Sequence, residues 1–156
     1  MKNLIKLAGA AAVVLASSQA YAQTASGDVI FNGSILNTCT ISNINAGTLE
    51  AGTNNTVLSS RTNPANAGSA TVSANSNAFD ISVAAPTAFT TAPAGAAATF
   101  TADFTATGDT TQGTATSGPI DLNTGDTTVT VNMDATSSAG AFPTGAYSAT
   151  VVLTCE

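Results

Sequence analysis

The chain has 156 residues, a formal net charge of -6 and no histidine. This length corresponds to one domain of ordinary size. Without histidine, Ser-His-Asp and Cys-His catalytic groups are excluded, and so is a zinc site built from histidine and cysteine. We therefore expect no enzymatic activity, no catalytic residues, no metal site and no cofactor.

Residues 1–22 have the features of an export signal. Two lysines precede an apolar run, and Ala20-Tyr21-Ala22 places small residues where signal cleavage before Gln23 requires them. The apolar run is about half the roughly 20 residues of a transmembrane helix, so we expect no membrane insertion. The sequence predicts a single mature domain over residues 23–156, exported to the periplasm and then to the cell surface or the medium. Cleavage after Ala20 is the alternative.

The mature chain is strongly acidic. One cation, Arg61, remains against nine acids, which gives a net charge of −8. Nucleic acids and anionic lipid surfaces are bound mainly through Lys and Arg. We therefore expect neither a nucleic-acid partner nor a membrane partner.

The two cysteines, Cys39 and Cys155, are expected to form a disulfide, because an exported chain folds in an oxidising compartment. The bond would close a loop over most of the domain, for which loop-closure entropy gives about 4 to 5 kcal/mol of stabilisation.

Most of the mature chain alternates apolar and polar residues, which is the pattern of half-buried β-strands. Clusters of Gly, Pro and Asn separate these runs, and helical periodicity is weak throughout. About seven or eight short strands joined by turns are typical of an antiparallel β-sandwich. Both cysteines lie on the apolar phase, so they should face one core. The expected strands are 29–41, with a break near Asn37, 70–74, 79–83, 100–104, 129–133 and 147–155.

The two ends of the mature chain resemble a known group of exported subunits. Residues 27–41, GDVIFNGSILNTCTI, are similar to the first strands of chaperone-usher pilus subunits and of the spore coat protein U family, which contain an alternating strand, a central Gly and a Cys. Residues 145–155, GAYSATVVLTC, resemble the Gly-x-Tyr-x-x-x-Val strand at the C-terminus of those subunits.

The resemblance implies an all-β, immunoglobulin-like antiparallel sandwich that lacks its final strand. In that family a periplasmic chaperone, and then the extension of the next subunit, fills the resulting groove. It implies a structural subunit of a fimbria, pilus or coat, assembled by β-strand complementation with other copies or related subunits, with a chaperone and an outer-membrane usher as partners. The candidate strand-complementation residues are Val29, Phe31, Ile35, Tyr147, Val151 and Leu153.

Two features depart from the family. Its subunits usually pair the first cysteine with one at about the position of Ala74 and Asn75, not with one at the far end. They also carry a donor extension before the first strand, whereas only residues 23–26 precede Gly27 here. Either residues 29–35 are themselves donated, or the chain is a self-complete secreted adhesive or binding domain of the same architecture.

Two further segments have alternative interpretations. Residues 121–126 place oxygen ligands before a Gly as calcium loops do, but no Glu follows at the required distance, so we expect an ordinary polar turn. Tyr147 is expected to pack in the core with its hydroxyl reaching a loop, and a partner surface is the alternative.

Overall fold

The computed structural model describes residues 25–156. The export signal predicted over residues 1–22 lies outside the described residues. By its internal contacts the chain divides into two units, Met1–Ser34 and Ile35–Glu156. The described part of the first unit, residues 25–34, contains no helix or strand, and all its residues are exposed. Within residues 25–156, no helix is long and apolar enough to cross a membrane.

The second unit is an antiparallel β-sandwich, which confirms the predicted all-β class. Every strand pair in the described chain is antiparallel, and a 3-10 turn at Thr53–Asn55 is its one helical element. The strands are β1 (Cys39–Asn45), β2 (Glu50–Ala51), β3 (Val57–Ser59), β4 (Gly68–Ala74), β5 (Asp80–Ala84), β6 (Ala98–Gly108), β7 (Gln112–Thr116), β8 (Ile120–Asp121), β9 (Gly125–Ser137) and β10 (Val152–Cys155).

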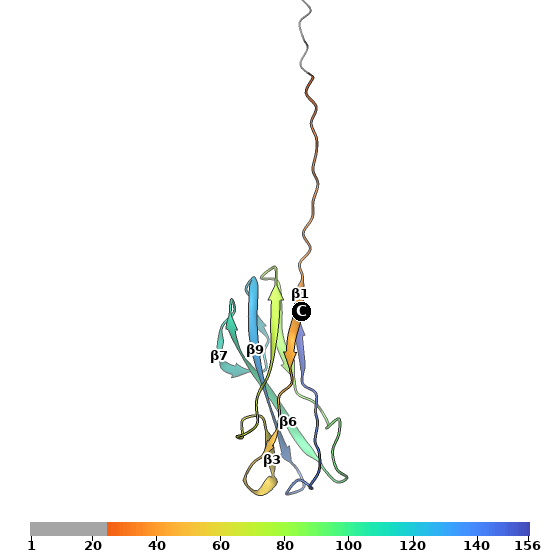
Figure 1. Cartoon of the computed structure of the whole chain (residues 1–156), viewed down its shortest axis with the longest axis vertical. Coiled ribbons are helices and arrows are strands. Elements are labelled where there is room, and N and C mark those ends of the chain that lie inside the picture. The colour runs from red at the N-terminus through yellow and green to blue at the C-terminus, as the bar shows by residue number, and fades with distance from the viewer. Residues whose placement is uncertain (1–24) are drawn as a thin grey trace, which may run out of the picture. The chain divides into compact units, whose positions relative to one another are not determined.

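The larger sheet is organised around β9, its longest strand (Figure 1). One side of β9 pairs with β6, which continues to β7. Along its other side β9 pairs first with β4 and then with β3, and β1 lies beyond β4 as an edge strand. The smaller sheet has the order β10-β5-β8, so β10 is also an edge strand.

The core lies between the two sheets. Its members come from the apolar phase of the alternating strands, because successive side chains of a strand point to opposite faces. Each large side chain removed from water in this way contributes about 1.5 to 3 kcal/mol. The largest fully buried side chains are Phe104, Ile81, Leu122, Val72 and Val129, together with Thr127.

The predicted disulfide is present. Cys39 is the first residue of β1 and Cys155 is the last residue of β10, and their Cα atoms are 6.4 Å apart. Both cysteines pack against the main core cluster, as their apolar phase predicted. The bond therefore joins the two sheets through their edge strands.

The structure corrects the prediction of a half-buried strand that begins at residue 29. Strand β1 begins only at Cys39, where its ladder with β4 begins. Ahead of it Val29 is 76% exposed, and Phe31 and Ile35 are each 91% exposed. An alternating sequence forms a strand only when a neighbouring strand supplies hydrogen bonds, and no described strand pairs with this segment.

The other predicted strands are present, with changed limits. Those at 70–74, 79–83, 100–104 and 129–133 correspond to β4, β5, β6 and β9, all but β5 longer than predicted. Residues 147–151 are extended but form only a bridge at Ser148, so β10 is shorter than expected. Four short strands, β2, β3, β7 and β8, were missed because none contains enough alternating apolar residues to be seen.

The sandwich is closed along one seam by the chain itself. Residues 117–119 cross from β7 in one sheet to β8 in the other, and the Val83 amide donates to the Ser117 carbonyl at 2.9 Å. Gly118 is required at this crossing: its φ is 89° and a Cβ would lie 2.6 Å from the Ile81 carbonyl oxygen. At the opposite seam β1 and β10 belong to different sheets and are joined at one end by the Cys39–Cys155 disulfide.

Candidate functional site

The open seam contains a groove of about 820 Å³ between β1 and residues 147–153. Its floor is formed by inward-facing residues of β4 and β9, including Ala70 and Met133. None of the residues that line it carries a charge, although the whole chain has nine Asp and Glu residues. The large apolar residues of its walls and floor are Ile41, Ile44, Leu49, Val131, Met133, Tyr147, Val151 and Leu153.

Both walls present backbone groups that have no ladder partner on the groove side. Among the described strands, β1 pairs only with β4 and β10 pairs only with β5. Further along the second wall, Ser148 exchanges backbone hydrogen bonds with Thr91. Such edges accept an additional strand, because their N–H and C=O groups remain available.

Burial alternates along the second wall: Tyr147, Ala149, Val151 and Leu153 are half-buried, whereas Ser148, Thr150 and Val152 are exposed. Tyr147, Ala149, Val151 and Leu153 line the groove, while the intervening residues do not all reach it: Val152 is 54% exposed and lies outside the lining. Three of the sequence-predicted complementation residues, Tyr147, Val151 and Leu153, therefore lie together along one wall.

Tyr147 is fixed at one end of this wall by aromatic packing. Its ring makes edge-to-face contacts with Phe89 and Phe142, at centroid distances of 5.1 and 5.4 Å. Its hydroxyl donates to the carbonyl oxygen of Pro143 in the preceding loop. This confirms the prediction that Tyr147 packs against the core with its hydroxyl reaching a loop. The same residue also borders the groove.

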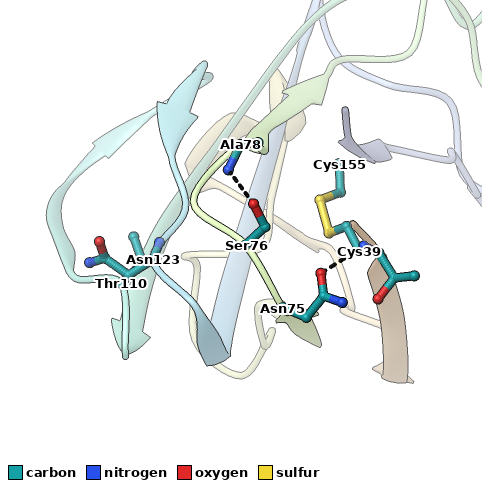
Figure 2. Close-up of a disulfide and its surroundings, with 8 residues drawn as sticks. Cys39, Asn75, Ser76, Ala78, Thr110, Asn123 and Cys155 are labelled. Atoms are coloured by element: carbon teal, nitrogen blue, oxygen red, sulfur yellow. Dashed lines mark hydrogen bonds between the residues drawn. A yellow bond between two sulfur atoms is a disulfide. The ribbon is translucent and has the colours of Figure 1, made fainter. Parts of the chain in front are cut away.

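The disulfide closes the other end of the groove. Figure 2 shows Cys39 and Cys155 joined at the start of β1 and the end of β10, and the C-terminus lies beside the start of β1 in Figure 1. Because β1 runs away from this bond and β10 runs toward it, the two groove walls are antiparallel. The bond holds the ends of the two edge strands at a fixed separation.

The segment before β1 contains the other three predicted complementation residues, Val29, Phe31 and Ile35, and their side chains are exposed to solvent. Monomeric proteins seldom expose contiguous large apolar side chains. Its apolar residues also alternate, in two sets on opposite faces of an extended chain. The exposed members are Val29, Phe31 and Ile35 in one phase and Ile30 and Leu36 in the other.

Asn75, directly after β4, binds the junction between this segment and β1. Its Oδ1 accepts from the Thr38 amide at 2.8 Å, and its Nδ2 donates to the Leu36 carbonyl at 2.8 Å. Its own amide donates to the Thr38 carbonyl at 3.2 Å. Figure 2 shows the Asn75 amide group directed at the chain next to Cys39. Sequence reasoning missed this residue, since one Asn in a turn carries no specific signal.

An acidic cluster lies next to the closed end of the groove. Asp80 is paired with Asp121 in the β5–β8 ladder, and it exchanges backbone hydrogen bonds with Glu156 at 2.8 and 3.1 Å. Partial burial, a shared hydrogen bond with Asp121 and repulsion by Asp121 and Glu156 raise the pKa of the Asp80 carboxyl. The folded state therefore binds a proton here more tightly than the unfolded chain does.

We expect Asp80→Asn to raise the melting temperature at neutral pH. A raised pKa contributes stability below the unfolded pKa, and this contribution is lost as pH rises through the folded pKa. The advantage of the variant should therefore shrink as pH falls toward about 4. Thermal unfolding at a series of pH values measures this, with Asp28→Asn in the exposed segment as a control without effect. A variant that is less stable than wild type at neutral pH would contradict the interpretation.

The segment considered as a calcium loop is a turn held by protein groups. The Thr124 amide donates to Asn77 Oδ1 at 2.7 Å, and the Asp126 amide donates to Asp109 Oδ2 at 2.7 Å. Carboxylate and amide oxygens thus bind backbone N–H groups in this turn.

Comparison of the chain with protein-family models, with curated proteins and with solved structures found no match.

Proposed function

We propose that this protein is a structural subunit of a bacterial surface fibre or coat, assembled by β-strand complementation. In the proposed assembly, residues 29–35 of one copy enter the groove of another copy. One observation carries the proposal: the same chain has an uncharged apolar groove between two edge strands and an exposed apolar segment that pairs with none of its described strands.

The segment and the groove match in length and period. The wall presents side chains at four alternate positions from Tyr147 to Leu153, and the segment has four alternate positions from Val29 to Ile35. Each spans about 20 Å at the rise of a β-strand. Residues 29–36 carry no charge, and neither does the groove lining. An added strand would therefore bury no unpaired charge.

The energetic gain from complementation is large. Burying a Val, Ile or Phe side chain contributes about 1.5 to 3 kcal/mol each, and Val29, Phe31 and Ile35 would enter together. Backbone N–H and C=O groups of both edge strands would gain partners at the same time. A filled groove should therefore be much more stable than an empty one.

The position of β4 supports the resemblance to pilus subunits. In those subunits the first cysteine usually pairs with one near the position of Ala74 and Asn75, and here Ala74 lies opposite Cys39 in the β1–β4 ladder. The first two long strands thus correspond, although Cys39 bonds to Cys155 instead.

Exchange of a segment between identical copies gives a head-to-tail contact. Because the donor segment and the groove are different surfaces, the contact does not close on itself and leads to a chain of subunits. Before assembly an empty apolar groove is an aggregation hazard. We therefore expect a periplasmic chaperone and an outer-membrane usher to accompany export to the cell surface.

The proposal is tested with native cell-surface extract run unheated and boiled on a denaturing gel, using an antibody to the mature chain. Strand-complemented polymers dissociate slowly, because release requires unfolding of a filled groove. We expect a ladder of multiples without heating that collapses to monomer on boiling. A single monomer band in both lanes would refute stable strand exchange and favour a self-complete secreted binding domain.

A further inference from the structure

The extension of each copy is also joined to the strand that borders its own groove by a short stretch of chain. When a ligand is joined to its own binding site by a short linker, its effective concentration is about millimolar or higher if the linker can span the sites. Subunits at lower concentration would therefore complement themselves unless the geometry prevents it. Assembly into a fibre requires a feature that excludes the chain's own segment.

The residues that would have to reverse direction are Leu36, Asn37 and Thr38. They are the whole connection between Ile35 and Cys39. Asn75 binds both ends of this connection: its side chain bonds to the Thr38 amide and to the Leu36 carbonyl, each at 2.8 Å. These bonds continue the β1–β4 ladder beyond Cys39, so the connection runs on as an extension of β1.

A reversal at this point would break all three bonds to Asn75. It would also have to occur next to the Cys39–Cys155 disulfide, which closes the adjacent end of the groove. The returning segment would lie antiparallel to β1 and hence parallel to residues 147–153. Parallel pairing is slightly less stable per residue, whereas a segment from a second copy is free to enter antiparallel to that wall.

We propose that Asn75 is the residue that keeps the extension out of its own groove and thereby directs it to the groove of a second copy. This inference rests on the proposed function. Asn75 acts by positioning the connection, because its hydrogen bonds go to Leu36 and Thr38 and not to the donated residues 29–35. The Cys39–Cys155 disulfide assists by fixing the strand to which the connection is attached.

The test compares full-length mature chains that carry Asn75→Ala or Asn77→Ala, refolded at one low concentration. Asn77 is the matched control, because its side chain also takes part in two hydrogen bonds, both accepted from the Thr124 amide and hydroxyl rather than made to the connection before β1. Unheated gels measure monomer against multimer, and limited proteolysis measures protection of residues 25–38 within the monomer.

With Asn75→Ala we expect the ratio of protease-protected monomer to multimer to rise about tenfold, since each hydrogen bond lost contributes a several-fold factor. The Asn77 variant should keep the wild-type ratio.

Equal ratios in wild type and the Asn75 variant would overturn the role of Asn75. An absence of multimers in wild type itself would instead refute the proposed function, so the two failures are distinguishable. If Asn75→Ala does not refold, Asn75→Asp, which keeps the acceptor for Thr38, replaces it and should give a smaller rise in the same direction.

Discussion

Phe31→Asp is expected to abolish assembly, whereas Ile30→Asp is expected to leave most of it intact. In an inserted strand, alternate side chains face the groove and the intervening ones face solvent. Phe31 belongs to the groove-facing set with Val29 and Ile35, and Ile30 belongs to the other set. Phe31→Asp removes a large apolar contact and places a carboxylate in an uncharged groove. The combined loss of about 3 kcal/mol or more corresponds to at least a hundredfold fewer multimers.

Comparing the Phe31 and Ile30 variants distinguishes strand insertion from non-specific hydrophobic association. Both side chains are highly exposed, at 91% for Phe31 and 78% for Ile30, and both variants add the same charge. Multimers are counted on unheated gels, and thermal unfolding checks that each variant folds. If both substitutions reduce assembly equally, the segment acts as a non-specific hydrophobic tail. The prediction that alternate side chains of an inserted strand face the groove would then be wrong.

Removing the disulfide is expected to cause the largest loss of stability. The Cys39→Ser, Cys155→Ser double variant should lower the free energy of unfolding by about 4 to 5 kcal/mol, the value for closure of so long a loop. The sequence separation is 116 residues, and the bond joins the edge strands of two sheets. It should also weaken assembly, because the groove walls would no longer be held together at one end. Denaturant unfolding measures the first effect, and unheated gels measure the second.

Reductant provides the control for this experiment. Reduced wild type should match the double variant, and the variant itself should not respond to reductant, since the described chain has no other cysteine. The double substitution avoids the free thiol that a single one would leave. A denaturation midpoint that is the same for the variant and oxidised wild type would show that the bond contributes little to the sandwich.

The alternating pattern predicted most of the long strands and the disulfide. Residues on the inward phase of β4, β6 and β9 are buried as the sequence indicated, because a strand has only two faces and the apolar face must be covered. Cys39 and Cys155 lie on the apolar phase of their strands, and they form the disulfide. The short strands were missed, since β7 (QGTAT) contains no apolar alternation and is defined by its neighbour β6 alone.

The same pattern was misleading at residues 29–38. They alternate apart from Ile30, Leu36 and Asn37, yet they have no strand partner within the described chain. Periodicity reports that a segment can form a half-buried strand, and it contains no information about which chain supplies the partner. Here the prediction of an own-domain strand was wrong. The notion that residues 29–35 are donated stays a prediction, and the experiments above test it.

The amino-acid sequence was sufficient to predict the all-β class, the apolar phase of the main strands and the covalent link between Cys39 and Cys155. All three follow from local composition and from the redox chemistry of two cysteines. Three features became visible only in the folded chain: β1 and β10 are edges of different sheets, an uncharged groove lies between them, and Asn75 binds the chain ahead of β1. These features depend on contacts between residues distant in sequence, and strand order is set by how the sheets pack together.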